Sequence, residues 1–190
     1  MPTFWQWFFA IVGGVAFIMA TTPFLQIVFG QSKLEFTFGY DDSGGDGRLI
    51  KIYLRNCPIE NRILQAFRVS RLAALDVFLT LQVFNTSTGK AILNLFSPDI
   101  ALSSSHKANR VSLPPSSLSV SVSLAKWQRS TNSAVLLGNH DIPLQEGTYV
   151  VVIGRGLDGK VGTSRPFSFH VGNIETELMW DKDVTKTRWI

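Results

Sequence analysis

The chain has 190 residues, of which 45% are hydrophobic and only 17% are charged, whereas an average soluble protein has about 25% charged residues. This length allows one domain and an additional element, and the composition excludes a disordered chain, a coiled coil and a simple hydrophilic enzyme. The formal net charge of +4 comes from 18 Lys and Arg against 14 Asp and Glu spread along the chain, so we expect no concentrated basic surface for nucleic acid.

The first 30 residues form an apolar segment that predicts a transmembrane anchor. No charged side chain occurs between residues 1 and 32, and about 20 apolar residues are enough to cross a bilayer as a helix. Trp5 and Trp7 suit an interfacial position, where an aromatic ring remains half hydrated. Because proline lacks the backbone N–H that a helix needs, Pro23 is expected to kink or end the helix.

A cleaved signal peptide is the alternative interpretation of this segment. Such a peptide needs a basic region, a short apolar run and a cleavage site flanked by small residues. Here the terminal amine is the only positive charge before the apolar run, and near Ala20 the cleavage positions hold Ile18 or Pro23. We therefore expect the anchor to remain on the mature protein. The lysines and arginines near it are too few to decide topology, and we expect a plasma or inner membrane with the following domain on the periplasmic or extracellular side.

The anchor contains two pairs of small residues at the spacing that lets helix backbones approach closely in lipid. They are Ala10 with Gly14, and Ala16 with Ala20. This spacing favours a helix of another membrane subunit as the partner. A hydrophobic tether without any specific partner is the alternative.

Beyond residue 30 the apolar residues alternate with polar ones, which is typical of antiparallel strands with one face in water. The clearest alternating segments are residues 34–40, 50–54, 75–83, 118–124, 149–153 and 167–171. Weaker apolar runs at 91–96, 100–103 and 134–137 raise the total to about seven to nine strands. The sequence therefore predicts an all-β antiparallel sandwich over residues 31–172, preceded by the single helix.

Turns and one interruption divide the predicted strands. Residues 41–47 and 85–90 are rich in turn formers, and Asp158 with Gly159 is a strong hairpin dipeptide. Residues 60–74 have roughly helical spacing, so we expect a short helix that crosses from one sheet to the other.

Residues 145–151 resemble the tyrosine corner of immunoglobulin-like and fibronectin-type sandwiches, with Tyr149 as the corner residue. The resemblance covers mainly residues 144–172 and implies the shape of the domain, without any functional residue. Val151 stands where antibody domains have their second core cysteine, and Cys57 is the only cysteine of the chain. We therefore expect no disulfide-bonded immunoglobulin domain.

No motif points to catalysis, a metal or a cofactor. Residues 154–159 fit G-x-G-x-x-G, but a strand rather than a helix is expected to follow, so a hairpin is the better interpretation. The three histidines, His106, His140 and His170, are scattered, and Cys57 has no histidine near it in sequence. We expect a non-catalytic protein, with an anchored enzyme or copper carrier as the least favoured class.

Two surface features could bind partners. Arg62, Arg68 and Arg71 form the densest basic cluster, which could contact anionic lipid headgroups or an acidic partner, or could simply be solvated. Asn85 begins a glycosylation sequon, which has meaning only in a eukaryotic secretory setting.

The chain ends with a tail over residues 173–190 that contains Trp180 and Trp189. Since exposed tryptophan is unfavourable without a partner, the tail is expected to dock on the domain or on another subunit. The sequence as a whole favours an accessory subunit that stabilises a larger membrane complex, for example a photosynthetic or respiratory assembly. Its expected partners are other membrane subunits and the lipid bilayer, with no nucleic acid. The alternative is an independent anchored module for ligand binding or adhesion.

Overall fold

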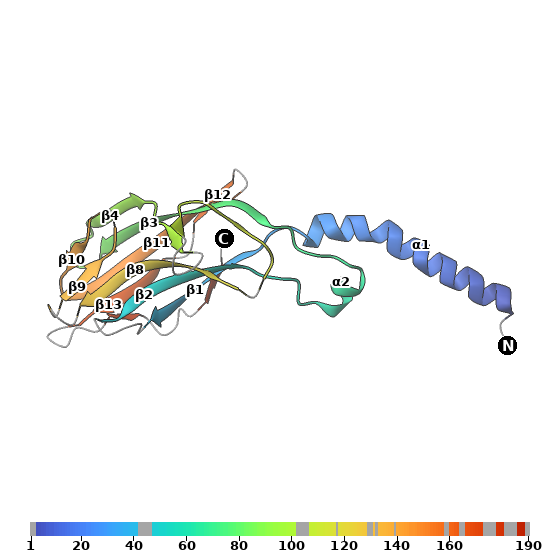
Figure 1. The fold of residues 1–190 in the computed structure, drawn as a ribbon, viewed down its shortest axis with the longest axis horizontal. Coiled ribbons are helices and arrows are strands. Elements are labelled where there is room, and N and C mark those ends of the chain that lie inside the picture. Colours follow the sequence, from blue (N-terminus) through green and yellow to red (C-terminus); the bar gives the residue numbers. More distant parts are fainter. Residues whose placement is uncertain are drawn as a thin grey trace.

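The computed structural model describes residues 3–41, 47–101, 107–116, 118–128, 131, 133–138, 140–157, 160–163, 166–172, 178–180 and 186–188. It has a long N-terminal helix, α1 (Phe4–Phe29), which projects from one end of a β domain (Figure 1). No residue of α1 is buried. The predicted apolar helix and the predicted predominance of β structure are both confirmed.

Pro23 does not end the helix, because α1 continues to Phe29 with Pro23 inside it, and the predicted kink stays a prediction. Proline removes one backbone N–H from the helix, but neighbouring hydroxyls add bonds in the preceding turn. The Thr21 hydroxyl donates to the carbonyl of Phe17 at 2.8 Å, and the Thr22 hydroxyl donates to the carbonyl of Ile18 at 2.7 Å.

The described strands of the β domain form two antiparallel sheets (Figure 1). The 8-stranded sheet has the order β10 (Ile142–Leu144), β9 (Ser133–Leu136), β8 (Val120–Gln128), β2 (Leu49–Asn56), β1 (Leu34–Asp41) and β15 (Lys186–Arg188), with β5 (Ile100–Ala101) and β6 (Lys107–Ala108) beside β8. The 7-stranded sheet has the order β14 (Leu178–Trp180), β13 (Phe167–Val171), β11 (Gly147–Leu157), β3 (Ala74–Asn85) and β4 (Ala91–Phe96), with β12 (Lys160–Thr163) on β11 and β7 (Val111–Leu113) on β3.

The predicted number of strands was too low. In the part of the chain that the structure describes there are 15 strands, eight of which have only two to four residues. Period-2 alternation needs several residues to be visible in a sequence. The prediction therefore captured the long strands and missed most of the short ones.

The core lies between the sheets and is formed by the inward-facing set of each alternating segment. Phe36, Ile52, Leu79, Val122 and Val151 are all 1% exposed or less. Burial of such side chains supplies most of the driving force for folding.

Two apolar residues of the alternating segments are exposed rather than buried. Leu75 is 55% exposed because the register of β3 shifts between Ala74 and Val77, so that Ala74 takes the buried position. Leu118 is 82% exposed and precedes β8. The expectation that both residues lie in the core was wrong.

The Tyr149 side chain carries the hydrogen bond of a tyrosine corner. Its hydroxyl donates to the carbonyl of Gln145 at 2.7 Å, and its ring stacks on Phe169 with the ring centroids 5.4 Å apart. Burial raises the pKa of the Tyr149 hydroxyl above its ordinary value. This bond fixes the turn that leads into β11.

Two predicted connections are present. Residues 154–157 of β11 pair with β12, so the glycine-rich motif is followed by a strand, as expected of a hairpin. Its tip, Asp158 and Gly159, lies outside the described residues, as do turn residues 42–46. The chain between β2 and β3 contains α2 (Arg62–Ala66) and crosses from one sheet to the other.

The described parts of the C-terminal tail pair with the domain of the same chain. β14 adds to the edge of one sheet by pairing with β13, and β15 adds to the edge of the other by pairing with β1. The backbone of Trp180 lies opposite Phe169 in this pairing. The side chain of Trp180 and the whole of Trp189 lie outside the described residues.

Candidate membrane-interface site

The described residues hold few groups that could carry chemistry. They contain no group of three or more His, Cys, Asp and Glu that could hold a metal ion. His140 and His170 are exposed, and His106 lies outside the described residues. The Cys57 thiol is buried and donates to Glu35, and its pKa is raised mainly by burial and then by that hydrogen bond. A raised pKa opposes formation of the reactive thiolate.

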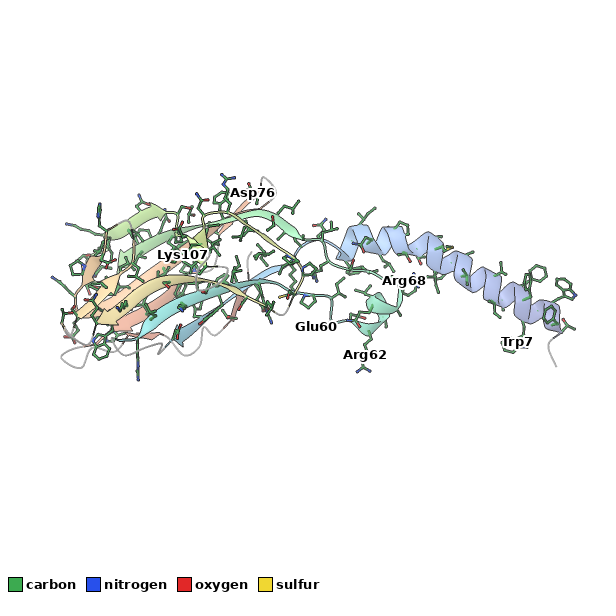
Figure 2. All side chains as sticks on the ribbon, in the orientation of Figure 1. Trp7, Glu60, Arg62, Arg68, Asp76 and Lys107 are labelled. Carbon is green, nitrogen blue, oxygen red and sulfur yellow. The ribbon has the colours of Figure 1, made fainter. Side chains whose placement is uncertain are left out.

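Helix α1 is long and apolar enough to cross a membrane. Its 26 residues rise about 1.5 Å each and therefore extend about 39 Å, compared with about 30 Å for the hydrocarbon core of a bilayer. The β domain buries none of its most apolar window, so α1 is not a core helix of that domain. Trp5 and Trp7 are both exposed, and Trp7 is labelled near the N-terminal end of the helix in Figure 2.

The four small residues of α1 lie on two different faces of the helix. At about 100° per residue, the pair Ala10 and Gly14 lies about 120° around the axis from the pair Ala16 and Ala20. All four are exposed or partly exposed in the isolated chain. A Cβ atom built at Gly14 would meet nothing within 4 Å. The helix therefore offers two open faces where another backbone could approach.

The connection between β2 and β3, residues 57–73, folds back along the C-terminal part of α1, and we call it the arm (Figure 1). The Gln26 amide pairs with the backbone of Ser70: its Nε2 donates to the carbonyl at 2.7 Å, and its Oε1 accepts from the N–H at 3.0 Å. The N–H of Leu72 donates to the carbonyl of Gly30 at 2.6 Å. These bonds attach the arm to the helix over more than one turn.

Arg71 and Thr22 extend this attachment in both directions. One Arg71 guanidinium nitrogen donates to the carbonyl of Gln31 at 2.7 Å and to that of Phe29 at 3.3 Å. A positive charge is favourable there because helix carbonyls at the C-terminus have no partner within the helix. Arg71 therefore closes the C-terminal end of α1. One turn before Gln26, the Thr22 hydroxyl lies 3.4 Å from the carbonyl of Phe67, which extends the attachment toward the middle of the helix.

The other two arginines of the predicted cluster are exposed on the arm. Arg62 and Arg68 form no ion pair with any described residue. Figure 2 shows Arg62 pointing away from α1 and Arg68 lying near the helix. Asn61 caps α2 through its Oδ1, which accepts from the N–H of Ile63 at 2.9 Å and from that of Leu64 at 3.4 Å. The arm is thus a folded element that presents two cations without an ion-pair partner among the described residues.

Asn56 joins the arm to both sheets, and sequence analysis missed it. It is 1% exposed. Its Oδ1 accepts from the N–H of Lys33 at 3.0 Å, while its Nδ2 donates to the carbonyls of Leu72 at 2.9 Å and Leu113 at 3.0 Å. The available signal was its position, since Asn56 follows Ile52 and Leu54 in the inward-facing set of β2.

Glu35 is a second buried polar residue near this end of the domain. It was expected on the wet face of β1, but it is 6% exposed. Arg55 on β2 donates to its carboxylate at 2.9 Å, and the Cys57 thiol donates to the same oxygen at 3.2 Å. The hydrogen bond with Glu35 raises the pKa of Arg55. The pairing with Arg55 explains how a carboxylate is tolerated there.

The helix, the arm and Asn56 together hold the β domain in a defined position at the end of α1. Only residues 30–33 separate α1 from β1, and the bonds to Gly30, Gln31 and Lys33 restrain that short segment. Comparison of the chain with protein-family models, curated proteins and solved structures found no match.

Proposed function

We propose that the protein is a non-catalytic, single-pass membrane subunit that stabilises a larger membrane complex. In this proposal α1 crosses a plasma or inner membrane, and the β domain contacts neighbouring subunits on the periplasmic or extracellular side. The observation that carries the proposal is the restrained junction between α1 and the β domain. A flexible linker would suit a module that searches for its ligand, whereas a fixed orientation suits a subunit that must meet several neighbours at once.

The open faces of α1 support a partner helix within the bilayer. Lipid solvates leucine as well as another helix does, so specific association in a membrane depends on close backbone packing or polar contacts. Gly14 and Ala20 lie on the two open faces and would allow such packing. A helix contact and a domain contact on one chain raise each other's effective concentration, so neither needs to be strong alone.

We further propose that the β domain is an immunoglobulin- or fibronectin-like sandwich. Two antiparallel sheets and the bond from Tyr149 to Gln145 support this fold. Cys57 is buried against Glu35, so the core relies on apolar packing rather than on the disulfide of antibody domains.

The proposal is tested by co-isolation of the tagged full chain from its native membrane. We expect wild type and Val15→Leu to co-purify with a constant set of subunits, because residue 15 already has a bulky side chain. Gly14→Leu or Ala20→Leu should release the chain, depending on which face binds the partner helix. Wild-type protein that purifies without any other subunit would contradict the proposal.

An independent ligand-binding module is the second candidate, and one observation favours it. A surface cleft of about 290 Å³ lies where the segment around β5 and β6 meets β8 and the residues between β9 and β10. It is lined by Pro98, Asp99, Ala101, Lys107, Ser123, Leu137, Gly138 and Asp141. Its two carboxylates and one ammonium group could orient a small polar ligand. Ligand binding by a chain that purifies alone, lost in Asp99→Asn with Asp141→Asn, would favour this candidate.

A further inference from the structure

The position of the arm along α1 places it at the level of the lipid headgroups, if α1 spans a bilayer as proposed above. Residues 4–22 would extend about 29 Å, close to the thickness of the hydrocarbon core. The seven residues from Pro23 to Phe29 would then extend about 10 Å, enough to pass through a headgroup layer about 5 to 7 Å thick. The arm is hydrogen-bonded to α1 at Thr22 through Phe67 and at Gln26 through Ser70, and so this part of the arm lies within that layer.

Exposed large hydrophobic side chains gather at this end of the β domain. Outside α1, such side chains among the described residues are Ile63, Leu72, Leu75 and Leu118, with exposed fractions between 55% and 82%.

Each of these four residues is tied to the end of the domain from which α1 projects. Ile63 lies in α2, and the backbone N–H of Leu72 donates to the carbonyl of Gly30 at the end of α1. Leu75 follows at the start of β3. Leu118 is two residues beyond Ser116, whose N–H donates to the carbonyl of Asn56 at 3.0 Å. Figure 1 shows the start of β3 and the arm on the α1 side of the domain.

The charge of the arm is complementary to an anionic lipid surface. Three arginines and one glutamate give residues 57–73 a net charge of +2. Arg71 is engaged at the helix end, whereas Arg62 and Arg68 are exposed and form no ion pair with described residues. Basic side chains at the surface of a leaflet are attracted to its anionic phosphates. Apolar side chains between them favour insertion at the boundary of headgroups and acyl chains.

We propose that the arm and the segment around Leu118 form a second membrane contact, which binds anionic phospholipid headgroups through Arg62 and Arg68. Ile63 enters the headgroup layer beside the bound lipids, while Leu72 and Leu118 lie on the same side of the domain, at the outer edge of that layer. This contact lies next to the spanning helix, so it fixes the tilt of the β domain against the leaflet. The inference rests on α1 spanning the membrane, and it needs no partner subunit.

Fluorescent labels on the full chain in lipid nanodiscs test the contact. In a Cys57→Ala background, Ala66→Cys in α2 and Ser119→Cys beside Leu118 report on the proposed contact without replacing its residues. Lys90→Cys, in the turn between β3 and β4, is the control at the far end of the domain, and Val15→Cys reports on the span. Lipids with a quencher on the headgroup should quench label 66 most strongly, label 119 less and label 90 least, while lipids with an acyl-chain quencher should quench label 15.

The arginine pair is tested by comparing phosphatidylcholine discs with discs that also contain phosphatidylglycerol. Phosphatidylglycerol should increase the quenching of label 66 in the wild-type background. Arg62→Gln with Arg68→Gln should weaken this response by about fivefold for each charge removed. Lys90→Gln with Lys107→Gln removes the same charge away from the arm and should leave the response unchanged.

Three outcomes contradict different parts of the account. Equal quenching of labels 66, 119 and 90 together with a quenched label 15 would overturn the second contact and leave the span intact. If the arginine and the lysine double variants lose equally the increase in quenching that phosphatidylglycerol causes at label 66, the role of the arginines would be overturned. Absence of quenching at label 15 would instead contradict the spanning helix, and therefore the proposed function itself.

Discussion

Replacing Asn56 by alanine removes the three side-chain hydrogen bonds that hold the arm, the start of β1 and β7 together. A buried hydrogen bond contributes about 1 kcal/mol on average, and a buried backbone group left without a partner costs about 1 to 3 kcal/mol. The N–H of Lys33 and the carbonyls of Leu72 and Leu113 would all lose their side-chain partner. We expect Asn56→Ala to lower the free energy of unfolding by about 3 to 5 kcal/mol.

The matched control is Asn94→Ala. Asn94 is exposed, and its side chain accepts one bond from Gln82 at 3.0 Å, so its loss should cost no more than about 0.5 kcal/mol. Urea unfolding of the full chain in mild detergent, followed by near-ultraviolet circular dichroism, measures both values. Trypsin should also cleave Asn56→Ala faster at Arg62 and Arg68, because the arm loses its attachment to Leu72. Equal unfolding free energies for Asn56→Ala and Asn94→Ala would refute this reasoning.

Three further predictions use the same unfolding assay. Phe169→Ala should lower the free energy of unfolding by about 3 to 5 kcal/mol. His170 lies on the exposed side of β13, so His170→Ala should change it by no more than about 0.5 kcal/mol. Equal losses would mean that the register of β13 is wrong. Gly47→Ala should lower the free energy of unfolding by about 2 to 3 kcal/mol, because Gly47 has φ +133° and a Cβ there would meet a backbone carbonyl of β8. Gly89 has φ +63° but open space around it, so Gly89→Ala should lower the free energy of unfolding by only about 1 kcal/mol. Burial raises the pKa of the Cys57 thiol above its ordinary value of 9.0. As the pH rises above 9.0, the unfolded chain therefore loses this proton before the folded chain does, and the free energy of unfolding should fall. The fall should be smaller in Cys57→Ala, which has no thiol at this position.

The long elements could be predicted from the sequence because their signals are local. Unbroken apolarity identifies α1, and period-2 alternation identifies the long strands. The tyrosine-corner bond of Tyr149 joins residues only four apart in the chain. Each of these patterns can be recognised within a short window.

The errors arise where distant residues or local geometry decide the outcome. Leu75 was expected in the core, but a register shift in β3 turns it outward. Glu35 was expected in water, but its carboxylate accepts hydrogen bonds from Arg55 on the neighbouring strand β2 and from Cys57, the residue that follows β2. The helix α1 continues past Pro23 rather than ending there, and the hydroxyls of Thr21 and Thr22 bond to carbonyls of the preceding turn.

The candidate site was predicted only in part. The sequence draws attention to Arg62, Arg68 and Arg71 as a group, but it does not separate their roles. Arg71 reaches the carbonyl of Gln31, 40 residues away in the chain, and Gln26 pairs with Ser70 over 44 residues. Contacts over such separations depend on the fold, and no local pattern encodes them.

Native mass spectrometry of the wild-type chain, extracted from its own membrane in mild detergent, tests whether the protein is a subunit of a larger membrane complex. We expect the 21.1 kDa chain to appear in an assembly of constant stoichiometry with other membrane subunits. Stronger detergents should release it as a chain that still contains residues 4–29. A chain observed only as a 21.1 kDa monomer under the mildest extraction would contradict the subunit proposal. A mature chain that lacks the apolar helix would contradict the membrane anchor.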